Sequence, residues 1–168
     1  MTARVIAVAN QKGGVGKTTT AINLAASLAL VERRVLAVDI DPQANLTSGI
    51  GLKGQASSQG TVYEALIAKT IPDFAGFVLQ TTVSGLSLVP AERNLTGAEF
   101  DLRELENGKT RLRSLVRQLV GRYDYIFIDT PPSLGLLTLN GLVAADTVLI
   151  PMLSEYFALE GLAELVST

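Results

Sequence analysis

The chain of 168 residues contains no cysteine, no histidine and no tryptophan. Without cysteine it has no disulfide, no thiolate metal site and no cysteine-held iron–sulfur cluster. Without histidine it also lacks the commonest general base and the commonest metal ligand of proteins. Any catalysis or metal binding by this chain would therefore depend on carboxylates, hydroxyls, lysines and backbone groups.

The chain also lacks a large excess of one charge and a long apolar run. The chain has 14 basic and 16 acidic residues, so its net charge of −2 does not indicate nucleic-acid binding. No apolar run approaches the length of a membrane-spanning helix, and Arg4 precedes only a short apolar run rather than a signal peptide. We therefore expect a cytoplasmic protein with one domain, residues 1–168, that buries a real core.

Short apolar runs alternate with helical patterns along the chain. The runs predict buried strands at 4–10, 35–38, 125–129 and 147–150, with weaker candidates at 78–82 and 86–89. Helical spacing predicts helices at 17–31, 61–69, 94–106, 109–122, 134–145 and 157–166, and a turn or short helix at 45–51. This alternation predicts an α/β fold with a mainly parallel sheet that helices cover on both faces.

A glycine-rich stretch from Gln11 to Thr19 lies between the first predicted strand and the first predicted helix. Glycines let backbone N–H groups turn toward an anion, and the positive end of the helix points to the same place. Lys17 would bind the outer phosphates of a nucleotide, and the Thr18 hydroxyl would ligate Mg²⁺. The alternative is a turn with two solvated lysines, but the flanking strand and helix favour nucleotide binding.

Acidic residues occur at the ends of two predicted strands. Asp39 and Asp41 follow the strand at 35–38, and Asp129 ends the strand at 125–129. Ligands collect at the carboxyl ends of parallel strands, so Asp129 is a candidate Mg²⁺ ligand, with a simple loop cap as the alternative. Asp41 would project to the same side as Asp39 in an extended chain, where it could orient an attacking water. It could equally form a turn before Pro42, and sequence spacing leaves that choice open.

The glycine-rich stretch departs from the plain G-x-x-x-x-G-K-[ST] pattern, because Gln11 replaces the first glycine and Lys12 adds a second lysine. The resulting K-G-G-x-G-K-T-T form resembles the deviant Walker A loop of partition and septum-site ATPases. Further segments in the same order make the whole chain similar to ParA/Soj-type chromosome or plasmid partition ATPases: 12–19, 39–51, 61–66, 123–151 and 155–161.

This resemblance implies a three-layer P-loop NTPase fold and a homodimer that sandwiches two ATP molecules, each with Mg²⁺, and hydrolyses them. Lys12 would be the signature lysine that reaches the partner's nucleotide, Asp41 would position the hydrolytic water, and Asp129 would be the Walker B acid. Thr18 and Asp129 would hold the metal, and 43–47 and 131–135 would be switch regions. The nucleotide-binding residues would be Gly13, Gly14, Val15, Gly16, Lys17, Thr18 and Thr19.

The resemblance also implies partners. The ATP-bound dimer of the full-length form would bind DNA non-specifically, and a ParB-type centromere-binding protein would stimulate hydrolysis. The protein would be cytoplasmic and nucleoid-associated, and it would not bind a membrane. Typical members are longer, so we expect this chain to lack the C-terminal portion, which includes the last sheet strands and the main DNA-contacting arginines.

Two other functions are compatible with the loop. A MinD-like septum-site ATPase cycles on membranes through a basic amphipathic C-terminal helix, but the helix predicted at 157–166 carries Glu160 and Glu164 and no basic residue. A nucleotide-binding fragment without turnover is the other alternative. A nitrogenase-reductase relative is excluded because cysteines are absent, and the absence of an N-K-x-D motif favours ATP over GTP.

One local basic row recurs every four residues at Lys109, Arg113 and Arg117, with Arg111 and Arg122 nearby. These side chains could follow DNA phosphates. The solvated face of a helix whose other face is core is the favoured interpretation.

Overall fold

A computed structural model describes residues 2–153, and the helix predicted at 157–166 lies outside these residues. Within them, six strands form one sheet in the order β3-β4-β2-β5-β1-β6. All neighbours are parallel except β3 and β4. The strands are β1 (Arg4–Val8), β2 (Val35–Asp39), β3 (Leu79–Gln80), β4 (Leu86–Val89), β5 (Tyr125–Asp129) and β6 (Thr147–Leu149). The predicted mainly parallel sheet is confirmed, with its antiparallel strand at one edge.

Helices connect the strands as the sequence patterns predict. The α-helices are α1 (Lys17–Leu30), α2 (Asn45–Gly49), α3 (Val62–Ile67), α4 (Ala98–Arg103), α5 (Arg111–Val116) and α6 (Leu136–Ala144), and the 3₁₀ helices are η1 (Phe74–Phe77) and η2 (Arg93–Gly97). Thr61 begins α3 with a reciprocal capping box: its side chain accepts from the Tyr63 N–H, and the Glu64 carboxylate accepts from the Thr61 N–H.

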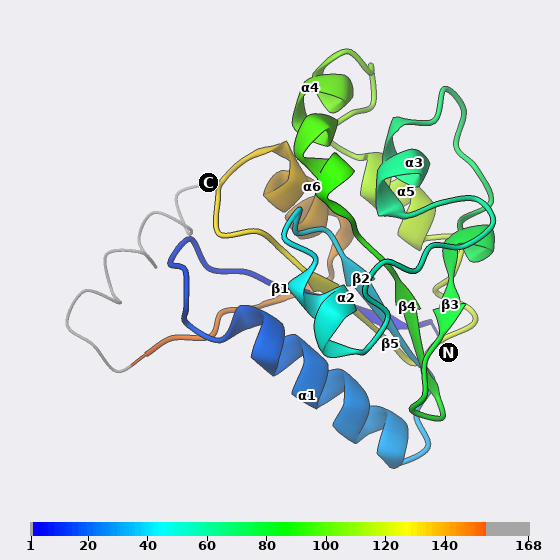
Figure 1. The fold of residues 1–168 in the computed structure, drawn as a ribbon, viewed down its shortest axis with the longest axis vertical. Helices are drawn as coiled ribbons and strands as arrows, with labels where there is room; N and C mark the ends of the chain where they lie inside the picture. Colours follow the sequence, from blue (N-terminus) through cyan, green and yellow to red (C-terminus); the bar gives the residue numbers. More distant parts are fainter. Residues whose placement is uncertain (1, 154–168) are drawn as a thin grey trace.

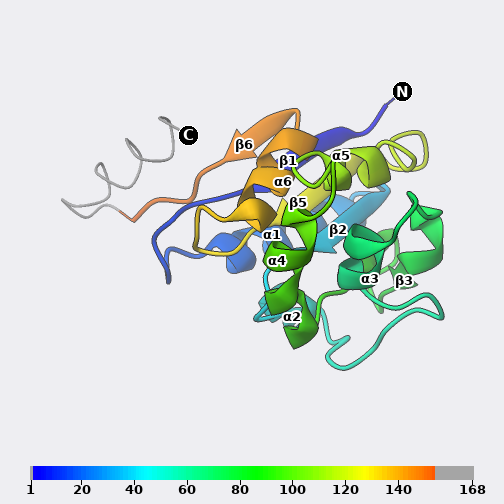
Figure 2. The ribbon, with the colours of Figure 1, turned by 90° about the horizontal axis from the view of Figure 1, so that it is seen from above.

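The sheet has a separate apolar core on each face because successive strand side chains point to opposite sides. Val35 and Ala37 of β2 pack with α1 and α2, whereas Leu36 and Val38 pack with α3, α4, α5 and α6. Figures 1 and 2 show this arrangement, with α1 on one side of the sheet and α6 on the other. Helices on both faces account for strands that are apolar at nearly every position.

Two predicted helices are shorter than expected. The stretch 94–106 begins as 3₁₀ helix η2 and becomes α-helical only at Ala98, because Gly97 at the junction is a poor helix former. The stretch 109–122 is α-helical only in α5, after which the chain tightens into i→i−3 bonds such as the Gln118 N–H to the Leu115 carbonyl, 3.2 Å. Its predicted core stripe is buried: Leu112, Leu115, Val116 and Leu119.

The basic row on this segment is a solvent-exposed face, as favoured from the sequence. Lys109, Arg113 and Arg117 are exposed, and Arg117 pairs with Asp146 at 3.3 Å. The nearby Arg111 is not part of this exposed face, because its side chain is buried and donates to the carbonyls of Ala68 and Thr70. Arg111 therefore ties α5 to the segment after α3.

Strand register sets the position of the candidate site. β5 lies between β1 and β2, and Asp129 is the register partner of both Val8 and Asp39. The glycine-rich loop follows β1, so the loop and the three acids meet at the same edge of the sheet. Asp39 and Asp129 are both fully buried there.

Candidate functional site

The loop between β1 and α1 opens its backbone toward an empty space. Gly14 and Gly16 have φ angles of 75° and 86°, a left-handed conformation that a glycine adopts without strain. A Cβ atom built on Gly13, Gly14 or Gly16 would meet nothing within 4 Å. Since α1 begins directly after Gly16 at Lys17, its positive end lies at the same space. The loop therefore has the shape and polarity of an anion-binding cradle.

Hydrogen bonds on both sides of Lys12 hold the start of this loop. The Lys12 N–H donates to Asn10 Oδ1 at 3.0 Å, and Lys17 Nζ donates to the Lys12 carbonyl at 3.2 Å. Asn10 Nδ2 donates in turn to the Pro151 carbonyl at 2.8 Å, beyond the end of β6. The sequence analysis did not identify Asn10 as a site residue. Its place at the end of a predicted strand, just before the motif, was the signal that could have identified it.

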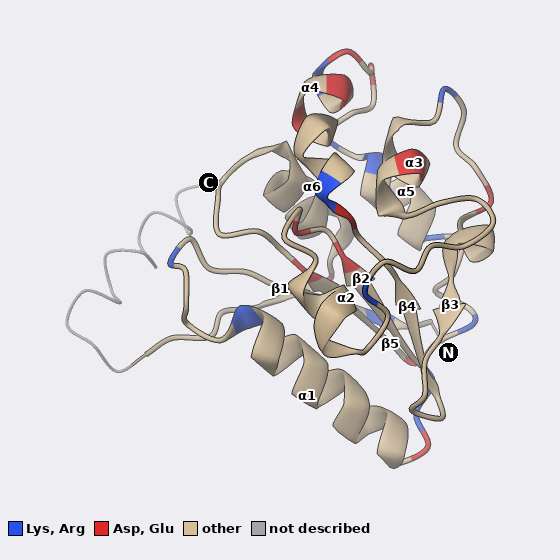
Figure 3. Ribbon diagram, in the orientation of Figure 1, with Lys and Arg blue, Asp and Glu red and all other residues tan. Residues whose placement is uncertain are grey.

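The Lys17 side chain is buried at the base of the loop, with 7% of its surface exposed. Burial lowers the pKa of Lys17, while the nearby carboxylates of Asp129 and Asp41 favour the charged ammonium. Figure 3 shows basic colouring at the start of α1. A buried ammonium at the start of a helix, beside a glycine-rich loop, is suited to a polyanion.

Asp129 joins this cradle from β5. Its Oδ2 accepts a hydrogen bond of 2.7 Å from Thr18 Oγ1, whereas its Oδ1 is buried and has no hydrogen-bond partner among the described residues. Burial raises the pKa of Asp129 to about 7, against the opposing effect of the Thr18 hydrogen bond, and Asp39 and Asp41 add to the rise. A buried carboxylate oxygen without a donor beside a threonine hydroxyl fits a hard cation such as Mg²⁺.

Asp39 is buried next to Asp129 but has a different environment. Its Oδ1 accepts from the Asp41 N–H at 3.1 Å, and its Oδ2 accepts from the Thr47 N–H and the Thr47 hydroxyl at 2.8 and 2.7 Å. Burial raises the pKa of Asp39 to about 6, although these hydrogen bonds favour the ionised form. Both of its oxygens are therefore occupied by donors from the chain itself.

Asp41 forms the turn that was one of the two interpretations left open by the sequence. Its Oδ1 accepts from the Gln43 N–H at 2.9 Å and its carbonyl accepts from the Ala44 N–H at 2.8 Å. It also lines the cavity in front of the glycine-rich loop, together with Lys17. The turn from Asp41 to Ala44 therefore leaves Asp41 on the wall of the cavity in front of the loop.

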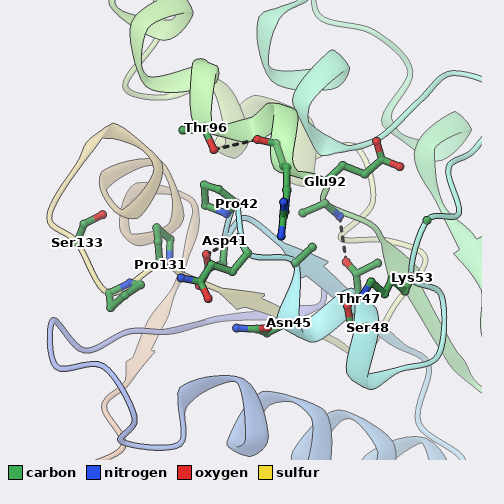
Figure 4. Close-up of a pocket in the computed structure, with 16 residues that line it drawn as sticks. Asp41, Pro42, Asn45, Thr47, Ser48, Lys53, Glu92, Thr96, Pro131 and Ser133 are labelled. Carbon is green, nitrogen blue, oxygen red and sulfur yellow. Dashed lines mark hydrogen bonds between the residues drawn. The ribbon is translucent and has the colours of Figure 1, made fainter.

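Two cavities meet at Asp41. The smaller, of about 340 Å³, is lined by the loop and by its neighbours: Gly13, Gly14, Gly16, Lys17, Thr18, Thr19, Asp41, Gln43, Asn45 and Pro132. The larger, of about 1180 Å³, shares Asp41, Gln43, Asn45 and Pro132 with it. Figure 4 shows the larger cavity between the segments that follow β2, β4 and β5. The glycine-rich loop, Lys17 and Thr18 line the smaller cavity and not the larger one.

These features define a class of protein. A parallel sheet between two helical layers, a glycine-rich loop between a strand and a helix, and a neighbouring strand that ends in an acid are the fold and site of P-loop nucleoside triphosphatases. Within residues 2–153, every helix is too short or too polar to cross a membrane.

The chain belongs to the AAA domain family, which it matches over residues 3–168, and within it to the ParA/Soj-type partition ATPases. It is 56% identical to the chromosome partitioning protein ParA of Myxococcus xanthus over 165 residues, which are 98% of this chain and 57% of that protein. It is 48% identical to the sporulation initiation inhibitor protein Soj of Bacillus subtilis over 165 residues, 98% of this chain and 64% of that protein. The chain thus spans about three fifths of the length of these relatives.

Solved structures give the same fold. A plasmid partition protein from Borrelia burgdorferi superposes with a TM-score of 0.88 at 33% identity, covering 99% of this chain and 72% of that one. A cobyrinic acid a,c-diamide synthase from Mycobacterium smegmatis, with bound ADP and magnesium, superposes with a TM-score of 0.90 at 39% identity, covering 98% of this chain and 66% of that one.

Proposed function

We propose that this chain binds ATP with Mg²⁺ and hydrolyses it as the nucleotide-binding part of a partition ATPase. The observation that carries the proposal is the contact of Thr18 with Asp129 at the glycine-rich loop, with the second Asp129 oxygen buried and without a donor among residues 2–153. Membership of the ParA/Soj-type family supports it, as does the structural neighbour that contains ADP and magnesium.

The phosphates would lie in the smaller cavity, against the backbone amides from Gly13 to Thr19. Lys17 would bind the outer phosphates as a buried ammonium. Thr18 and Asp129 would hold Mg²⁺, which would neutralise phosphate charge when bound. Because burial raises the pKa of Asp129 to about 7, a cation beside this carboxylate would also favour its ionised form.

Asp41 and Lys12 would act in hydrolysis. Asp41 lines the phosphate cavity, where its carboxylate can accept a hydrogen bond from an attacking water and orient it. Lys12 would stabilise the charge of the partner subunit's nucleotide in a closed homodimer, so its effect would appear only after dimerisation. The hydrogen bonds that fix the Lys12 peptide support a defined starting position for that side chain.

The proposed biological role is that of an ATP-dependent dimer switch for chromosome or plasmid segregation. The ATP-bound dimer of the full-length form would bind DNA non-specifically at the nucleoid, in the cytoplasm, and a ParB-type partner would stimulate hydrolysis. Its similarity to chromosome and plasmid partition proteins supports this role. The role is proposed for the whole protein, because this chain spans only about three fifths of the length of its relatives.

The test measures ATP binding by calorimetry and phosphate release by the 168-residue chain, with Mg²⁺ and with or without DNA. The longer Myxococcus xanthus relative is assayed in parallel for comparison. We expect ATP to bind only weakly without Mg²⁺ and to be hydrolysed when the cation is present. Binding without phosphate release would reject the hydrolytic part of the proposal, and the absence of ATP binding would reject all of it.

A further inference from the structure

Asp39 is a buried acid to which the proposed chemistry assigns no role. It is fully buried at the end of β2, directly opposite Asp129 in the sheet register. From its position alone, it could be a second Mg²⁺ ligand. The distribution of hydrogen bonds argues against that role, because both Asp39 oxygens already accept from donors of this chain.

Thr47 extends this contact to a third segment of the chain. Its hydroxyl donates to Asp39 Oδ2 at 2.7 Å and accepts from the Ala91 N–H at 3.0 Å. Thr47 lies in α2, and Ala91 lies in the connection between β4 and η2. Both residues line the larger cavity that meets the phosphate cavity at Asp41. Figure 4 shows Thr47 and Asp41 on the wall of this space.

The Asp39 carboxylate therefore joins three backbone segments at one buried point. One oxygen accepts from the Asp41 N–H, and the other accepts from Thr47 of the short helix α2. Ala91 is attached to the same point through the Thr47 hydroxyl. Because a buried carboxylate that loses a donor carries a large desolvation cost, these contacts favour a single arrangement of the Asp41 backbone.

We propose that Asp39 is a positioning residue, which holds Asp41 and α2 in the arrangement needed for hydrolysis through its bonds to the Asp41 amide and to Thr47. This role rests on the proposed ATPase function. It also separates the three acids of the site: Asp129 has the oxygen available to a cation, Asp41 faces the phosphate cavity, and Asp39 fixes the backbone between them.

The test compares Thr47→Val, which removes the hydroxyl but keeps the branched shape, with Thr47→Ser, which keeps the hydroxyl. Amide hydrogen exchange of the nucleotide-free 168-residue chain is measured for residues 40–48 and 90–92. In Thr47→Val we expect exchange to become about tenfold faster in both segments, as expected for the loss of a buried hydrogen bond, while β1 stays unchanged. In Thr47→Ser exchange should stay within about twofold of the original chain.

Kinetics supply the second readout. Thr47→Val should lower kcat about tenfold with little change in KM, and Thr47→Ser should restore it. Asp39→Asn, which replaces one acceptor oxygen by a donor group, should loosen the same two segments and lower kcat in the same way. Unchanged exchange in Thr47→Val and Asp39→Asn, or faster exchange with unchanged kcat, would overturn the proposal.

Failure of the proposed function gives a different result. A chain that does not hydrolyse ATP at all would still show whether Thr47 and Asp39 hold residues 40–48, because exchange is measured without nucleotide. Unchanged exchange would then reject the positioning role independently of the missing activity.

Discussion

At the scale of the residue, the site depends on how each charged group is neutralised or left available. Lys17 is buried and lies near two carboxylates, which compensate part of its desolvation. A triphosphate would bring more negative charge to the same ammonium and would compete with the Lys12 carbonyl for its N–H groups. Lys17 is therefore the side chain on which phosphate affinity should depend most strongly.

We expect Lys17→Ala to weaken ATP binding by about 100-fold or more, because a charge-assisted contact to the phosphates is lost. Calorimetric titration with ATP and Mg²⁺ measures this change. Lys69→Ala removes an exposed lysine far along the chain and should leave the affinity unchanged. An unaltered ATP affinity in Lys17→Ala would contradict the assignment of the site.

Lys12→Ala should separate binding from turnover. The loop start is held through the Lys12 backbone N–H and carbonyl, which the substitution keeps, so ATP affinity should stay within about threefold. Hydrolysis should fall by about 100-fold, because the proposed transition-state charge stabilisation is removed. Steady-state phosphate release beside ATP titration measures both quantities, and normal turnover in this variant would argue against the role of Lys12.

At the scale of the element, one pair of residues links the starts of the neighbouring strands β2 and β5. Arg34 and Asp124 precede β2 and β5, and the Arg34 backbone N–H and guanidinium both donate to the Asp124 carboxylate, at 2.9 and 2.7 Å. The Asp124 N–H donates back to the Arg34 carbonyl at 2.8 Å. These bonds fix the register in which Asp39 and Asp129 lie side by side at the other ends of the strands.

The Arg34 guanidinium lowers the pKa of Asp124 from 3.8 to about 2. A folded-state pKa below the usual value means that the ionised form stabilises the fold above pH 3.8, and that this contribution is lost as the pH falls toward 2. Asp124→Asn should therefore lower the urea midpoint at pH 7, and the difference from the original chain should shrink below pH 4. The pair is solvent-exposed, so salt should reduce the effect.

Unfolding curves between pH 7 and pH 3 measure this dependence, with the exposed Glu106→Gln as the control for removing one acid. The control should show no comparable loss at pH 7. A pH-independent difference between Asp124→Asn and the original chain would show that the hydrogen bonds act without the charge.

At the scale of the whole molecule, the two cavities meet on one edge of the sheet, beside the segments that follow β1, β2 and β5. Asp41 lies where they join, so a partner subunit that covered this edge would lie next to the phosphates. In the homodimer that the partition-ATPase resemblance implies, Lys12 of one subunit would thus reach the nucleotide of the other.

Asp41→Ala should let the ATP-bound dimer form but lower turnover by about 100-fold or more, because the group proposed to orient the water is removed while the phosphate contacts remain. Size-exclusion chromatography with ATP and Mg²⁺, beside phosphate release, measures both. The Myxococcus xanthus relative with the corresponding substitution shows whether the longer protein behaves in the same way. Turnover equal to that of the original chain would reject the role of Asp41.

Much of the architecture was readable from local patterns. The loop motif, the apolar strands and the acids that follow them are contiguous in sequence, and parallel strands necessarily bring their carboxyl ends to one edge. The sequence therefore predicts that the loop and Asp129 lie at the same edge of the sheet, where the structure brings Thr18 and Asp129 into contact. The lengths of α4 and α5 were overestimated, since helical spacing continues through segments that tighten into 3₁₀ turns.

Tertiary structure alone decided which carboxylate oxygens of the three acids accept hydrogen bonds from the chain. Thr18 meets Asp129 across 111 residues of chain, and Thr47 meets Ala91 across 44. No periodicity encodes such contacts, because they depend on strand register and on which donors burial leaves near each oxygen. For that reason the sequence assigns no role to Asp39, whereas the folded chain gives Asp129 an available oxygen and leaves none on Asp39.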